Sequence, residues 1–81
     1  MAGVGRAPAD ARFLVAFGEA VRAERERKGL SQEALGFEAE LDRTYVSGIE
    51  RGVRNPTVVT IRRLAAALGV APSRLMKSAE G

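Results

Sequence analysis

The stretch from Asp42 to Gly52, DRTYVSGIERG, constrains the fold more than any other part of the chain. Asp42 is a good helix N-cap, because its carboxylate can accept from the otherwise unpaired amides of the next turn. Gly52 suits the end of the same helix, because glycine adopts the left-handed conformation without a Cβ penalty. Val46 and Ile49 lie three residues apart, the spacing of a core-facing stripe. The opposite face carries small or polar residues: Arg43, Thr44, Ser47 and Gly48. The stretch therefore predicts a short helix that is anchored on one side and presents a polar surface on the other.

The size and composition of the chain limit what it can be. Its 81 residues are enough for one small domain. It has no Cys and no His, so we expect no disulfide, no metal site, no cofactor and no enzymatic activity. The net charge is +3 and nearly all of the cations are Arg, which suits bidentate contacts to phosphate and guanine. No apolar run is long enough to span a membrane, and residues 1–10 do not form a secretory signal, so we expect a cytoplasmic protein.

Hydrophobic periodicity and capping residues predict an all-α chain of five helices. We expect them at about residues 11–28, 32–39, 43–51, 58–68 and 72–77. The expected N-caps are Asp10, Ser31, Asp42 and Thr57. Residues 1–10 are rich in Gly, Ala and Pro and are expected to be a disordered arm, while residues 78–81 are expected to fray. The folded domain is thus expected to span residues 11–77.

The second and third helices are joined by a very short turn, so they are expected to cross steeply as a helix-turn-helix. Gly36 is placed where the following helix would approach closely, because glycine has no side chain to obstruct it. In the fourth helix the expected buried stripe consists of Val58, Ile61, Leu64, Ala65 and Leu68.

An Arg at the leading end of a helix that enters the DNA major groove can donate two hydrogen bonds to the O6 and N7 atoms of guanine. Arg43 is the candidate for this role, and Thr44 offers both a hydroxyl and a methyl group to a base edge. The plainer interpretation of Arg43, taken alone, is a solvated surface charge near the Asp42 cap. For Tyr45 two interpretations stay open: its hydroxyl contacts a phosphate, or its ring covers the edge of the core.

The longer segment LSQEALGFEAELDRTYVSGIERGVRNPT resembles the helix-turn-helix domains of the phage Cro and repressor type. Within that family, LDRTYVSGIERG followed by RNPT is most similar to the controller proteins of bacterial restriction–modification systems. The resemblance covers roughly residues 13–76. It implies a compact five-helix, lambda-repressor-like fold, a homodimer formed through the last helices, and binding to operator DNA.

The resemblance also implies roles for individual residues. Gln32 matches a glutamine that contacts phosphate and buttresses the motif, and Arg43 and Thr44 match base-reading positions. Tyr45 and Ser47 match neighbouring base or backbone contacts, and Arg54 and Asn55 match a phosphate-contacting loop. Arg25 and Glu50 match a largely buried salt bridge. Val70, Pro72 and Met76 are the expected dimer contacts.

One position departs from the family pattern. The turn residue at position 40, usually Gly in the family because the turn needs a positive φ, is Glu here. A residue with a side chain costs about 1 kcal/mol in that conformation. Either Glu40 accepts this strain or the turn has a slightly different geometry.

These observations predict a dimeric, sequence-specific transcription regulator that binds a near-palindromic operator, with the controller protein of a restriction–modification system as the narrower role. The acidic outer face of the second helix, Glu33 and Glu38, is either a contact for RNA polymerase or a solubilising surface. The alternative function is an antitoxin-type module that binds both a protein partner and its own operator.

Overall fold

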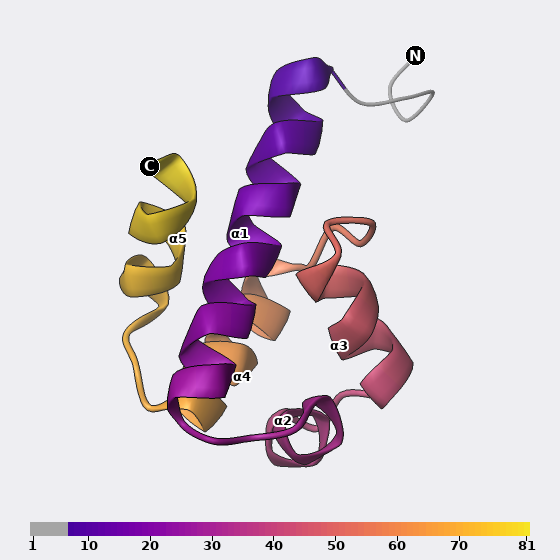
Figure 1. Ribbon diagram of the computed structural model, residues 1–81, viewed down its shortest axis with the longest axis vertical. Helices are drawn as coiled ribbons and strands as arrows, with labels where there is room; N and C mark the ends of the chain where they lie inside the picture. Colours follow the sequence, from indigo (N-terminus) through magenta and orange to yellow (C-terminus); the bar gives the residue numbers. More distant parts are fainter. Residues whose placement is uncertain (1–6) are drawn as a thin grey trace.

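The computed structural model describes residues 7–81, and within them it contains five α-helices and no strand. The helices are α1 (Pro8–Arg27), α2 (Gln32–Ala39), α3 (Arg43–Glu50), α4 (Val58–Leu68) and α5 (Pro72–Glu80). Figure 1 shows α1 along the length of the molecule, with α5 beside it and α2 at the bottom of the view, below α3. α1 contacts both α3 and α5, and α2 contacts both α3 and α4. The expected all-α, five-helix architecture is confirmed.

Three of the expected caps form as the sequence predicts. The side chains of Ser31, Asp42 and Thr57 accept backbone N–H bonds from the first turns of α2, α3 and α4 at 3.0, 2.9 and 3.1 Å. Gly69 ends α4 with a φ of 74°. These local signals fix where the three short helices begin and where α4 ends.

The ends of the helical domain differ from the expected bounds. α1 begins at Pro8, because proline fits the first turn of a helix, and its N-cap is Ala7. Asp10 therefore lies inside the first turn and is not the cap. Residues 1–6 of the expected arm lie outside the described residues. At the other end α5 includes residues 78–80, because Ala79 packs into the core.

The core lies between the five helices, and every helix contributes to it. Its largest fully buried side chains are Phe17, Val21, Leu35, Val46, Ile49, Leu64 and Leu75. The prediction for Val58 is wrong, since this residue is 82% exposed. Val58 is the first residue of α4, which begins outside the core, and the buried part of the stripe starts only near Ile61.

Two glycines allow backbone to pass directly over a helix. A Cβ on Gly18 of α1 would lie 2.3 Å from the Ile49 carbonyl oxygen of α3, far inside van der Waals contact. A Cβ on Gly36 of α2 would lie 2.6 Å from the Leu41 carbonyl oxygen. The predicted close approach at Gly36 is therefore present, although the nearest group belongs to the turn and not to the next helix.

The turn between α2 and α3 adopts the geometry usual for a glycine at position 40. Glu40 has φ 60° and ψ 43°, in the left-handed region. The Leu41 N–H donates to the Gly36 carbonyl at 2.7 Å, which closes the end of α2. Of the two possibilities left open by the sequence, Glu40 accepts the strain.

Candidate nucleic-acid interface

α3 is held on its inner side and is open at its leading end. Val46 and Ile49 are 0% and 1% exposed, and they fix the helix to the core. Arg43 and Thr44, in the first turn, are both exposed. The structure therefore places the two expected base-reading side chains on the surface at the N-terminal end of α3, where the amides that lack helical partners also lie.

Arg54, from the loop that follows α3, lies back across the helix. Its guanidinium carbon is 5.6 Å from the centroid of the Tyr45 ring, within the range of a cation–π contact. Its stem covers Gly48, where a Cβ would lie 2.6 Å from Arg54 Cγ. The expectation that Gly48 forms part of an open polar face is wrong for this reason: the residue is buried beneath Arg54. Tyr45 itself is half-buried and packs against the core.

Ser47 and Asn55 make few side-chain contacts that would assign them a role. Ser47 is half-buried, and its hydroxyl accepts a long hydrogen bond, 3.4 Å, from Nε of Arg51, the C-cap residue of α3. Asn55 is exposed in the loop between α3 and α4. Arg43 and Thr44 are thus at the leading end of α3, whereas Arg54 and Asn55 belong to the loop that follows its other end.

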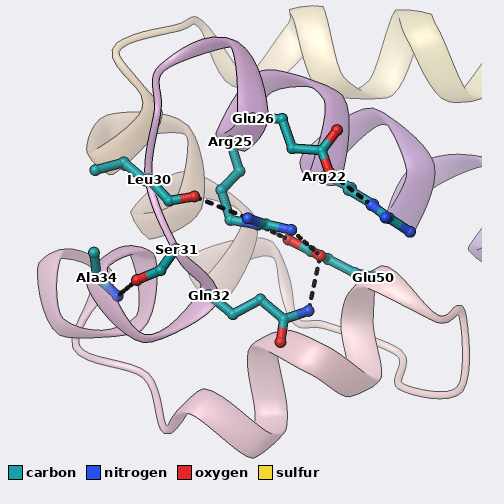
Figure 2. Close-up of polar contacts among 8 residues, drawn as sticks. All are labelled: Arg22, Arg25, Glu26, Leu30, Ser31, Gln32, Ala34 and Glu50. Atoms are coloured by element: carbon teal, nitrogen blue, oxygen red, sulfur yellow. Dashed lines mark hydrogen bonds and ion pairs between the residues drawn. The ribbon is translucent and has the colours of Figure 1, made fainter.

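Behind α3, Arg25 of α1 and Glu50 of α3 form a bidentate ion pair (Figure 2). Arg25 Nε and Nη2 donate to the two Glu50 carboxylate oxygens at 2.7 and 3.0 Å. The Gln32 amide donates to the same carboxylate at 3.0 Å, and Arg25 Nη1 donates to the Leu30 carbonyl at 2.8 Å. The two charged side chains are only 11% and 3% exposed. Hydrogen bonding to Glu50 raises the pKa of Arg25 above its usual value, against the effect of burial.

This network joins three helices at one point. Arg25, Gln32 and Glu50 come from α1, α2 and α3, and Leu30 lies in the connection between the first two. The Gln32 side chain points to Glu50, so its buttressing contact lies within the protein. The arrangement fixes the orientation of α3 relative to the rest of the domain.

The expected dimer residues lie at the turn between α4 and α5 and along α5. Pro72 is exposed, whereas Val70 and Met76 are half-buried against the core. α5 is tied to α1 by Arg74, whose Nε donates to Glu24 at 2.7 Å. Burial opposes ionisation of Glu24, but hydrogen bonds from Arg74 and Arg27 lower the pKa of this carboxyl below its usual value.

Sequence reasoning missed three of these contacts. The close approach at Gly18 and the Arg54 to Tyr45 contact carry no local signal, because each joins segments whose relative placement depends on the whole fold. The Arg74 to Glu24 pair spans 50 residues. Across residues 7–81, no His, Cys, Asp and Glu side chains gather into a possible metal site, and no helix is both long and apolar enough to cross a membrane.

Comparison with known proteins identifies the motif and the fold. A family model described as helix-turn-helix matches residues 21–75. The chain is 48% identical over 61 residues to the control protein C.BamHI of Bacillus amyloliquefaciens, which covers 74% of this chain and 75% of that protein. It is 41% identical over 56 residues to the control protein C.MunI of a Mycoplasma species, which covers 69% and 76% of the two chains. The crystal structure of the restriction–modification controller protein C.AhdI from Aeromonas hydrophila is similar with a TM-score of 0.76 and 53% identity, covering 76% of this chain and 94% of that one.

Proposed function

Since the chain belongs to the helix-turn-helix family of DNA-binding transcription regulators, we propose that it acts as a homodimer on a near-palindromic operator. The observation that carries this proposal is the anchoring of α3. Its inner side is buried through Val46 and Ile49 and is fixed by the Glu50 network, while Arg43 and Thr44 project from its leading turn. A helix held in this way can enter the major groove without rearranging the domain.

Base discrimination is assigned to Arg43 and Thr44. The Arg43 guanidinium would donate to guanine O6 and N7, a pairing worth about 1–3 kcal/mol against a wrong base. Thr44, next to it, would present its hydroxyl to a polar base edge or its methyl group to thymine. Ser47, one turn further along α3, would contact a neighbouring base or the sugar–phosphate backbone.

Register on the duplex is assigned to contacts with phosphate. Arg54 and Asn55 in the loop, the Tyr45 hydroxyl, and the amides at the start of α2 beside Gln32 would bind phosphates on the two sides of the groove. Such contacts carry no sequence information, but they supply most of the affinity and make it depend on salt.

Dimerisation is assigned to the surface formed by the α4–α5 turn and α5, which includes Val70, Pro72 and Met76. A two-fold pair presents two copies of α3, so the operator should consist of two related half-sites about 34 Å apart. With DNA as its ligand, the protein would act in the cytoplasm.

The narrower role is that of a restriction–modification controller protein. Its support is the similarity to proteins named as such, at 48% and 53% identity. In that role the protein would time the expression of an endonuclease gene and of its own gene. Glu33 and Glu38, both exposed on α2, are candidates for contact with RNA polymerase when the protein activates transcription.

Selection of binding sites from a random duplex library, with the mass of the free protein measured in solution, tests this proposal. We expect a near-palindromic consensus and a dimer mass. On the enriched duplex, Arg43→Ala should weaken binding by about 1–3 kcal/mol and relax one base position in each half-site. Arg12→Ala, at an exposed position on α1, is the matched control and should leave the consensus unchanged. A consensus that is the same for Arg43→Ala and the unchanged protein would refute the assignment.

A further inference from the structure

Gly48 occupies an unusual place in α3, because it faces outward and is nevertheless buried. It follows Thr44 by four residues, so the two lie one above the other on the same helical face. Thr44 is exposed, whereas Gly48 is covered by the stem of Arg54. A Cβ at position 48 would lie 2.6 Å from Arg54 Cγ and 3.2 Å from Arg54 Nε. The stem follows this path only because residue 48 has no side chain.

The far end of the Arg54 side chain meets Tyr45. The guanidinium carbon lies 5.6 Å from the ring centroid, close enough for the aromatic face to attract the cation. Tyr45 precedes Gly48 by three residues, so the ring and the bare backbone at position 48 are neighbours on the helix surface. The two residues therefore form one continuous seat, with backbone under the stem and an aromatic ring under the charge.

We propose that Tyr45 and Gly48 are positioning residues that hold the Arg54 guanidinium on the DNA-facing side of α3. The inference rests on the proposed function, in which Arg54 contacts DNA. Arg54 comes from the irregular segment between α3 and α4, and a long side chain there loses rotamer freedom when it binds. A seat that orders the guanidinium before DNA arrives removes part of this cost. A leucine at position 45 would fill similar space but would not attract the cation.

The test uses the full chain and the duplex enriched by selection, together with a random-sequence duplex. The proteins are the unchanged chain, Arg54→Ala, Gly48→Ala and the double variant. Gly48→Ala keeps every charge and places a more favourable helix former in α3, so its Tm should not fall. We expect Arg54→Ala and Gly48→Ala each to weaken binding about tenfold, the size of one charge-assisted hydrogen bond. The double variant should bind no more weakly than Arg54→Ala, because the seat has no function without Arg54.

The aromatic half of the seat is tested separately, which keeps the inference open to refutation if Gly48→Ala fails to fold. The loss caused by Arg54→Ala is measured again in Tyr45→Phe and Tyr45→Leu backgrounds. It should stay about tenfold with Phe, which keeps the ring, and shrink severalfold with Leu. The salt dependence gives a second readout, since Arg54→Ala should reduce the slope by about 1 per protomer.

The outcomes distinguish a failure of the seat formed by Tyr45 and Gly48 from a failure of the Arg54 contact with DNA. If Arg54→Ala weakens binding but Gly48→Ala and Tyr45→Leu leave the contribution of Arg54 intact, the seat is refuted and the DNA contact stands. If Arg54→Ala leaves both affinity and salt slope unchanged, the DNA contact itself is refuted and the seat with it. Additive losses in the Gly48→Ala, Arg54→Ala double variant would also refute the seat, because independent residues add.

Discussion

Breaking the buried ion pair between Arg25 and Glu50 should strongly destabilise the domain. Removing the carboxylate by Glu50→Ala leaves the Arg25 guanidinium, in a side chain only 11% exposed, without its partner. Loss of one member of a buried pair costs about 3–5 kcal/mol. Arg25 keeps its bond to the Leu30 carbonyl at 2.8 Å. We therefore expect a loss near the lower end of that range, about 3 kcal/mol.

The reverse substitution should be more damaging. Arg25→Ala leaves the Glu50 carboxylate, in a side chain that is 3% exposed, with only the Gln32 amide as a donor. Each left-over charge keeps one neutral hydrogen-bond partner, but Glu50 is the more deeply buried of the two, so the loss should lie at the upper end, about 5 kcal/mol. Replacing both residues together with apolar side chains of similar volume should cost less than either single truncation, because no charge is then left unpaired.

The assay is urea unfolding followed by circular dichroism, with the slope of the free energy against urea concentration compared between variants. In a domain of this size a loss of about 3 kcal/mol also lowers Tm by roughly 12–24 °C. The matched control is Arg22→Ala, which breaks another Arg–Glu pair on α1. That pair is 64% and 55% exposed, so its loss should cost less than about 1 kcal/mol.

The result that would refute the reasoning is a loss below about 1 kcal/mol for Glu50→Ala at an unchanged urea slope. It would mean that water reaches Arg25 readily and that the pair behaves like the exposed one on the same helix. Equal losses of unfolding free energy for Glu50→Ala and Arg22→Ala would lead to the same conclusion.

Two further predictions concern the turn and the α1–α5 contact. Glu40→Gly should stabilise the domain by about 1 kcal/mol in the same urea assay, because glycine adopts the positive φ of 60° without strain; a lower stability would count against strain at this position. The lowered pKa of Glu24 means that its pairing with Arg74 stabilises the fold above the unfolded-state pKa and is lost as the pH falls through the folded-state value. The difference in unfolding free energy between the unchanged chain and Arg74→Ala, measured from pH 7 downward, should therefore become smaller in acid. A difference that stays constant would contradict this role of the Glu24–Arg74 pair.

The sequence predicted the fold well because the relevant signals are local. Caps such as Ser31 and Thr57 act within a few residues of their position, and the apolar spacing in α3 defines its buried side directly. Val58 was mispredicted because periodicity identifies a helical face but not where along the helix the core begins. The end of α5 was placed too early because burial of Ala79 depends on a surface supplied by distant segments.

The candidate site was predicted less completely. Arg43 and Thr44 follow from their position at the start of α3, and the structure places both on the surface. The path of Arg54 over Tyr45 and Gly48 depends on how a loop folds back, and no spacing rule contains that information. In the sequence, only Gly48 on the outward side of the third helix hinted at this path. A glycine there is equally typical of a position that no neighbouring side chain constrains.

The contact at Gly18 has a consequence for how such proteins can change their target. α3 rests on α1 through the carbonyl oxygen of Ile49, so its seating at that point depends on main chain and on no outward-facing side chain. Under the proposed assignment, substitutions at positions 43, 44 and 47 would change the DNA sequence that is recognised, while the packing of α3 on α1 stays unchanged. Evolution, or a protein engineer, could thus change the DNA sequence that is recognised without changing how the domain folds.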